Sequence, residues 1–222
     1  MSRQKGDIMR DVLISLKPYY YYLIGEGIKK VEVRKSYPKA EDWSRNSWFY
    51  MSRDEKSFAK IPKEFQEKYR KHFGKVGMRF VCDRVIGTCP WRLKGETGLC
   101  AKRTEEETNF PNNACLTLEE IENYAGSRGR GIYGWHITDL VVYENPRELN
   151  EFRTPCKMRE MLCGICDYAV HGMDGDLIDC NTSLTRPPQS WCYIERTDLA
   201  FGRGGKSLGN FAKSLDFFCI LW

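Results

Sequence analysis

Three charged side chains of complementary chemistry follow each other closely in the first third of the sequence: Lys29, Glu32 and Arg34. The segment 29–35 alternates valine with charged residues, which predicts a strand whose charged face carries Glu32 and Arg34. Strict alternation places Lys29 on the valine face, so it joins the other two only if the strand twists or begins after it. Arginine offers a planar fork, lysine a point charge, and a carboxylate accepts from a base amino group. The trio therefore suits a nucleotide, and the alternative is an exposed strand covered by ion pairs.

Aromatic residues near these charges suggest a surface on which nucleobases could stack. Lys17 precedes a run of four tyrosines at 19–22, and Trp191 and Tyr193 share one face of a strand predicted at 190–195. Aromatic platforms flanked by cations are typical of single-stranded RNA binding. For the tyrosines and for the C-terminal pair, the alternative is packing in the core.

A second group of residues has the chemistry of a metal site. Four cysteines lie within a segment, 153–189, that is otherwise poor in apolar residues: Cys156, Cys163, Cys166 and Cys180. One CxxC pair with two further thiolates can bind Zn²⁺ tetrahedrally, and the metal would then stabilise a segment that has no core of its own. His171 and Cys192 are substitutes for a fourth ligand. Four thiolates would close the coordination sphere, so we expect structural rather than catalytic zinc, and the alternative is a set of buried free thiols.

Composition and charge restrict the class of protein. Hydrophobic residues make up 41% of the 222 residues, which is enough for a folded core. No apolar run approaches the length of a membrane span, and no apolar stretch follows the charged N-terminus, so we expect a cytoplasmic protein with no membrane contact. The net charge is +5, but residues 1–79 alone hold 19 Lys and Arg against 10 Asp and Glu. A basic first third suits a polyanionic partner such as RNA.

The elements that must position these residues can be read from hydrophobic periodicity. Residues 88–116 are polar and contain glycine, which indicates a long loop, and Thr117 with Glu120 forms a capping box that starts a helix. Other helices are expected at 19–24 and after Pro62, and strands at 11–16, 29–35, 44–52, 76–86, 132–143 and 190–195. Strands separated by short helices and long loops predict an α+β, mainly β fold: a small barrel with peripheral helices.

Several short motifs, taken in order, are similar to a known family. Residues 13–18 (LISLKP) are followed by 27–34 (GIKKVEVR), and three further motifs lie at 77–83, 135–149 and 187–195. Their composition and order resemble the activating signal cointegrator homology (ASCH) domain, in the type found in bacteria and their phages.

The resemblance implies a β-barrel of the pseudouridine-synthase-and-archaeosine-transglycosylase (PUA) type, with a cleft between barrel and helices. It further implies binding of RNA or a modified nucleoside. The domain would span residues 8–196, with 153–189 as a Cys-rich insertion stapled by zinc and 197–222 as a C-terminal tail. The expected site is a cationic cleft formed by Lys17, Lys29, Glu32, Arg34, Trp191 and Tyr193.

The resemblance also raises an enzymatic alternative. Some small bacterial relatives hydrolyse acetylcytidine with a Lys and a Thr of the first strand and a Glu elsewhere. Lys29 matches that Lys, and Glu32 stands where those enzymes have Thr. In this amidohydrolase reading, Lys29 acts as base or nucleophile activator with a lowered pKa, and Glu32 polarises water. A third alternative is a protein-interaction module that uses the apolar end of the tail, residues 217–222.

Overall fold

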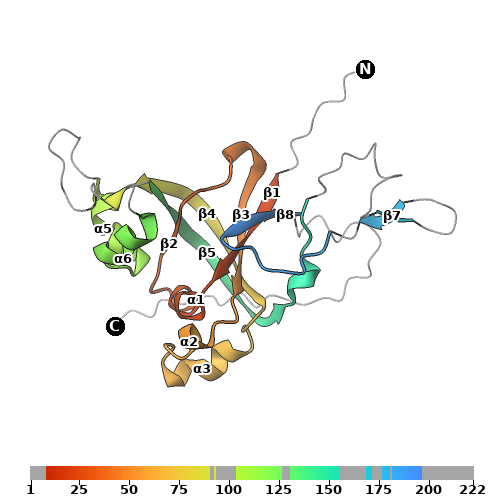
Figure 1. Ribbon diagram of the computed structural model, residues 1–222, viewed down its shortest axis with the longest axis horizontal. Helices are drawn as coiled ribbons and strands as arrows, with labels where there is room; N and C mark the ends of the chain where they lie inside the picture. Colours follow the sequence, from red (N-terminus) through yellow and green to blue (C-terminus); the bar gives the residue numbers. More distant parts are fainter. Residues whose placement is uncertain are drawn as a thin grey trace, which may run out of the picture.

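A computed structural model describes residues 9–90, 93, 104–126, 131–155, 169–171, 177–180 and 182–196. Its centre is a six-stranded mixed sheet in the order β2-β5-β4-β3-β1-β8, in which β1 and β3 are parallel and all other neighbours antiparallel (Figure 1). The strands are β1 Arg10–Leu16, β2 Val31–Arg34, β3 Trp43–Met51, β4 Val76–Thr88, β5 Ile132–Arg147 and β8 Trp191–Ile194. The fold is therefore α+β and mainly β, as the sequence predicts.

Short helices surround the sheet. They are α1 Pro18–Gly25, α2 Glu55–Phe58, α3 Lys63–Arg70, α5 Glu105–Ala114 and α6 Leu118–Ala125, with 3₁₀ turns η1 Ala40–Asp42 and η2 Leu149–Glu151. Figure 1 shows α5 and α6 beside the β2 edge of the sheet and α1 to α3 below it. None of the helices in the described part of the chain is long and apolar enough to cross a membrane.

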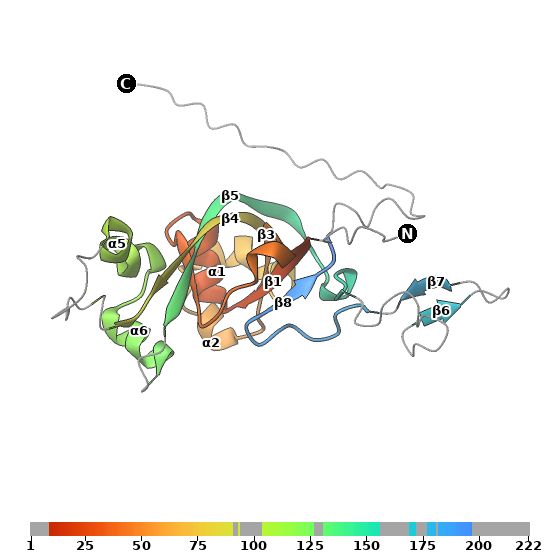
Figure 2. The ribbon, with the colours of Figure 1, turned by 90° about the horizontal axis from the view of Figure 1, so that it is seen from above.

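The sheet is strongly curved but open. Figure 2 shows β4 and β5 arching over α1. Among the described residues, β2 pairs only with β5, and no ladder joins β2 to β8 or β1, so the predicted closed barrel is wrong. The reason lies in β2 itself, which has four residues, and in β1, whose other edge is already paired with β8. A side chain spans the opening instead: Arg34 Nη2 donates to the main-chain oxygen of Ser15 in β1 at 2.7 Å.

The inner, concave face of the sheet holds the main core. Alternate residues of β1 (Val12, Ile14 and Leu16) pack there with Trp43 of β3 and Trp135 of β5. Helix α1 fills the concavity from the other side, with Tyr21, Tyr22, Leu23 and Ile24 all buried. For Tyr21 and Tyr22, core packing is therefore the correct alternative.

Helix α5 lies where the sequence suggested a loop, so the predicted loop over 88–116 is wrong in this part. Thr104 and Glu107 form a capping box of the same kind as Thr117 and Glu120, which start α6 as predicted. Phe110 and Ala114 of α5 pack with Val31 and Val33 on the outer face of β2. Both faces of this short edge strand are therefore covered.

The predicted Cys-rich insertion leaves and rejoins the domain at neighbouring points. Thr154 N donates to Thr182 O at 2.9 Å, and Leu184 N donates to Phe152 O at 2.8 Å. Between these points the described backbone comprises the hairpin strands β6 Ala169–His171 and β7 Leu177–Cys180. The predicted tail, 197–222, lies outside the described residues.

Candidate functional site

Lys29, Glu32 and Arg34 form one buried charged cluster. Glu32 lies between the two cations, with Oε1 at 2.9 Å from Arg34 Nη2 and Oε2 at 3.6 Å from Lys29 Nζ. Their exposed fractions are 3% for Lys29, 6% for Glu32 and 8% for Arg34. The exposed, solvated strand that the sequence left open as an alternative is therefore not observed.

Strict alternation would place Lys29 on the valine face of the strand. Lys29 joins the cluster because β2 begins only at Val31. Its Nζ donates to the main-chain oxygen of Ala114, the last residue of α5, at 2.6 Å. An ammonium group at this position satisfies a free carbonyl at the negative end of the helix dipole. Burial lowers the pKa of Lys29, and the neighbouring Glu32 carboxylate opposes this only in part.

Two polar groups beside the cluster have no hydrogen-bond partner in the described part of the chain. The register pairs Glu32 with Trp135 and Arg34 with Tyr133, so all four side chains lie on the inner face of the sheet. Arg34 Nε and Trp135 Nε1 are buried and make no hydrogen bond to any described residue. Unpaired buried donors are costly to a fold, so these two groups call for a physical explanation.

Two half-buried tyrosines flank the cluster. Lys29 Nζ lies 5.4 Å from the ring centre of Tyr20, and Lys35 Nζ lies 5.1 Å from that of Tyr124 in α6. Burial raises the pKa of Tyr20, and the carboxylates of Glu120 and Glu32 raise it further. Burial also raises the pKa of Tyr124, against the opposing charge of Arg34. Tyr124 was not among the site residues predicted from the sequence, although the Thr117 capping box correctly predicted the helix that carries it.

Trp191 and Tyr193 of β8 are half-buried and pack against the inner-face core. Trp191 lies 6.0 Å from Trp135, centre to centre, and its Nε1 donates to Ser36 Oγ at 3.1 Å. Tyr193 accepts from Lys39 N at 3.1 Å. Trp191 is therefore connected to the charged cluster through Trp135, whereas Tyr193 supports the segment that follows β2.

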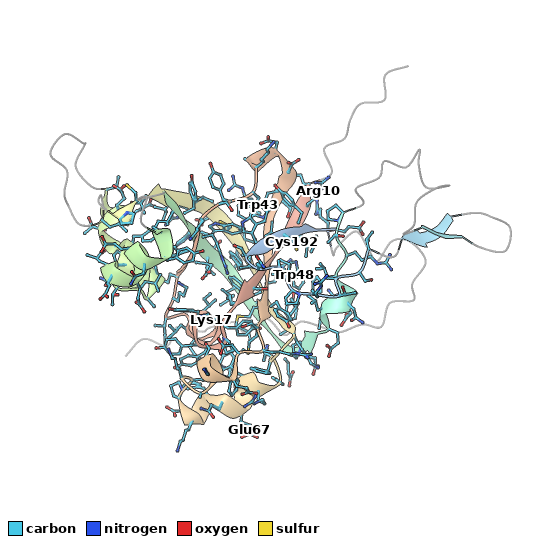
Figure 3. All side chains as sticks on the ribbon, viewed as in Figure 1. Arg10, Lys17, Trp43, Trp48, Glu67 and Cys192 are labelled. Carbon is cyan, nitrogen blue, oxygen red and sulfur yellow. The ribbon has the colours of Figure 1, made fainter. Side chains whose placement is uncertain are left out.

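Lys17 is exposed and lies just before α1, whereas Lys29 follows the other end of that helix (Figure 3). The chain turns back after α1, since Lys29 N donates to Leu23 O at 3.0 Å. Among the described residues Lys17 makes no ion pair with Glu32, so it is not part of the charged cluster.

The predicted zinc site falls largely beyond what the structure describes. Cys156, Cys163 and Cys166 lie outside the described residues, and for Cys180, at the end of β7, only the backbone is described. Within the described ranges there is no group of three or more His, Cys, Asp or Glu that could hold a metal ion.

His136 and His72 each have a defined side-chain partner. His136 is held by a carboxylate, Asp83 Oδ1, at 2.6 Å. His72, which follows α3, is buried, with 1% of its surface exposed, although its neighbours Arg70 and Lys71 are exposed. Tyr21 Oη lies 3.0 Å from its Nδ1, and burial lowers the pKa of His72 to about 4.

Comparisons with known proteins give a distant structural similarity. No protein-family model matches the chain, and no curated protein does. The crystal structure of an ASCH protein from Zymomonas mobilis matches with 16% identity and a TM-score of 0.41, covering 86% of this chain and 92% of that one. Crystal structures of two single-residue variants of that protein match with 15% identity and TM-scores of 0.42, covering 86% and 88% of this chain and 94% of each of theirs.

The family found among solved structures is the one that the sequence motifs resemble. At such low identity and TM-score, the similarity says nothing about function. Function has to be inferred from this chain's own residues.

Proposed function

We propose that the protein binds RNA, or a modified nucleoside, through the charged cluster on the inner face of its sheet. The observation that supports this most directly is the Glu32 carboxylate, buried between Lys29 and Arg34 beside two donors without partners. A fold gains little stability from such an arrangement, because desolvation of buried ions offsets most of their attraction. A ligand that uses the unpaired donors would explain why these groups face inward.

The groups present match the edges of a nucleobase. Glu32 can accept from an exocyclic amino group, whereas Arg34 Nε and Trp135 Nε1 can donate to a carbonyl or ring nitrogen. Tyr20 and Tyr124, with cations beside both rings, offer faces for stacking. The excess of Lys and Arg in residues 1–79 would add phosphate affinity that falls with salt.

The test is binding of fluorescently labelled RNA hexanucleotides at about 50 and about 200 mM salt. Glu32→Gln keeps the shape of the side chain and removes the carboxylate, whereas Arg34→Lys keeps the charge and removes the planar fork with its Nε donor. Both should weaken binding by about tenfold or more, because each removes a buried contact to the ligand. Arg70→Ala removes an exposed cation on α3, far from the charged cluster, and should leave binding within about twofold.

Thermal unfolding of each variant separates loss of binding from loss of fold. Wild-type protein that shows no saturable binding at low salt would remove the proposal. Equal binding by wild type, Glu32→Gln and Arg34→Lys would move the site elsewhere.

One observation favours the enzymatic alternative, hydrolysis of an acylated cytidine. The pKa of Lys29 is lowered by burial, and a lysine with a lowered pKa can act as a base near neutral pH. Incubation with acetylcytidine should then give cytidine and acetate, and Lys29→Arg should abolish turnover. Lys30→Arg is the matched control, since Lys30 is the exposed neighbour. Absence of turnover by wild type, or equal turnover by both variants, would reject the alternative.

For the cysteine-rich segment we propose structural zinc held by Cys156, Cys163, Cys166 and Cys180. The CxxC spacing and the adjacent ends of the segment, Thr154 and Thr182, support a compact stapled unit. Metal analysis should give about one zinc ion per chain, lost in Cys163→Ser and retained in Cys89→Ser. Metal-free wild-type protein, purified without chelator, would contradict this.

A further inference from the structure

A cavity of about 390 Å³ lies near the charged cluster and shares none of its residues. It lies between the segment that follows β2, the start of β3, the end of β4 and the start of β5. Trp43, at the start of β3, is labelled in Figure 3. Its lining comprises Tyr37, Pro38, Ala40, Trp43, Arg45, Asp83, Arg84, Val85, Gly87 and Tyr133. The volume lies within the range of about 300–1,000 Å³ that small-molecule sites occupy.

The cavity is connected to the charged cluster along β2 and β5. Tyr133, which lines it, is the register partner of Arg34. Trp43, which also lines it, packs on Trp135 at 5.0 Å between ring centres, and Trp135 is the register partner of Glu32. Residues two apart on a strand are separated by about 7 Å on the same face, a span that one sugar–phosphate unit can cover.

Aromatic rings and one uncommitted cation line the cavity. Tyr37 and Tyr133 lie 4.7 Å apart between ring centres, and Tyr37 is 47% exposed, so part of this aromatic pair faces solvent. Arg84 is already paired with Asp83 and Glu106. Among the described residues no carboxylate pairs with Arg45, whose guanidinium lies 5.3 Å from the ring centre of Trp43.

The backbone of Arg45 is also unusual. Its φ is +71°, in the left-handed region that glycine adopts far more readily than arginine. Arg45 lies between Trp43 and Ser47 of β3, where the β1–β3 register shifts. Strain of this kind is concentrated at functional sites, and here it places a cation at the cavity.

We propose that the cavity is a second nucleotide subsite, which holds the nucleotide next to the one at the charged cluster. Its base would stack on the Tyr37–Tyr133 pair, and its phosphate would bind Arg45. This inference rests on the proposed function and adds the path of the ligand: the bound strand runs from the charged cluster to the cavity beside Trp43, at the start of β3.

The experiment compares two ligands, hexauridylate and uridine, on the same variants. Arg45→Gly removes the guanidinium and suits the positive φ, so it should not impair folding. It should weaken hexauridylate binding at least about fivefold and reduce the slope of log affinity against log salt by about one. Uridine binding, which needs only the charged cluster, should stay within about twofold of wild type.

Tyr37→Ala should weaken hexauridylate binding at least about fivefold, and Tyr37→Trp, which keeps a stacking face, should restore it. Arg70→Ala serves again as the control for loss of an exposed cation.

The outcomes separate this inference from the proposed function. Hexauridylate binding that depends on Arg34 but is equal in wild type, Arg45→Gly and Tyr37→Ala overturns the second subsite and leaves the proposed function intact. An equal loss of uridine and hexauridylate affinity in Arg45→Gly also overturns it, because the cavity would then belong to the first site. Failure of wild type to bind either ligand removes both proposals.

Discussion

Two sets of ion pairs in this molecule use the same side-chain types in different surroundings. At β2, Glu32 lies between Lys29 and Arg34, with 7% of the Glu32 side chain exposed. At α3, Glu55 pairs with Arg70 at 2.9 Å, and 66% of the Glu55 side chain is exposed. The two sets look alike in the sequence. The charges themselves do not make the difference. Helices α1 and α5 cover the cluster at β2 and make it a candidate site, whereas the pair at α3 stays solvated.

The largest difference between the two regions should appear on removal of the central carboxylate. Glu32→Ala leaves two buried cations facing each other, and loss of one partner of a buried pair typically lowers the free energy of unfolding by about 3–5 kcal/mol. Urea unfolding measures this, with Glu32→Gln as a variant that keeps the shape and should lose less. A loss below about 1 kcal/mol in Glu32→Ala would mean that the cluster contributes no more stability than an exposed ion pair, and the distinction between the two regions would be wrong.

His72 shows that burial can change within two residues, because it is buried although it directly follows the exposed surface of α3. Its pKa in the folded protein is about 4, against about 6.5 in an unfolded chain, owing chiefly to burial, with Lys71 and Lys68 adding to the shift. Between these values the unfolded chain binds more protons, so stability is complete above about pH 6.5 and falls as the pH drops toward 4. The contribution of His72 should be at most about 3 kcal/mol.

The measurement is the free energy of unfolding between pH 7 and about 4.5 in wild type and in His72→Gln. The wild type should lose more stability over this interval than the variant, in which the group that titrates is absent. Parallel pH profiles would show that His72 protonates without unfolding the region around Tyr21.

Gly134 tests how tightly α5 packs on the outer face of β2, opposite the charged cluster. A Cβ at this position would overlap Phe110 of α5 and lie 2.6 Å from Val31 Cγ1. Gly134→Ala should therefore lower the free energy of unfolding by about 1–3 kcal/mol through overpacking. Gly87→Ala is the matched control in the neighbouring strand, since its nearest contact would be the Tyr133 ring at an ordinary 3.7 Å. Equal stability of the two variants would mean that α5 moves freely on β2.

The smallest effect is expected at the exposed pair. Glu55→Gln removes one charge next to Arg70, and solvent screening limits the loss to about 0.2–1 kcal/mol, falling further at high salt. Urea unfolding at low and high salt checks this. A salt-independent loss as large as that of Glu32→Ala would contradict the distinction drawn between the two regions.

The sequence predicted the strands and the composition of the cluster better than their surroundings. Alternation around Val31 and Val33 located β2 because period-two patterns are local. Burial of Glu32 and Arg34 is not local: it results from the curvature of the sheet and from helix α1, whose buried side chains fill the concave face. Alternation alone could not show that a polar face would be covered as well as an apolar one.

Other differences also have physical reasons. Helix α5 was missed because its residues are mostly polar and include Pro111, although Thr104 and Glu107 carry the same capping signal that correctly placed α6. The closed barrel was wrong because the number of strands does not reveal which edges pair, and β2 pairs with β5 alone among the described residues. Arg45 and Tyr37 gave no signal, since only the fold brings them to one cavity.

Residues 152–154 hydrogen-bond to residues 182–184, so the chain leaves and re-enters the described domain at one place. Since the two ends of the intervening segment already meet in hydrogen-bonded register, the chain between them can change in length or content at little entropic cost to the rest. Natural variation in length should therefore collect between residues 154 and 182, and not in β1, which is paired on both of its edges.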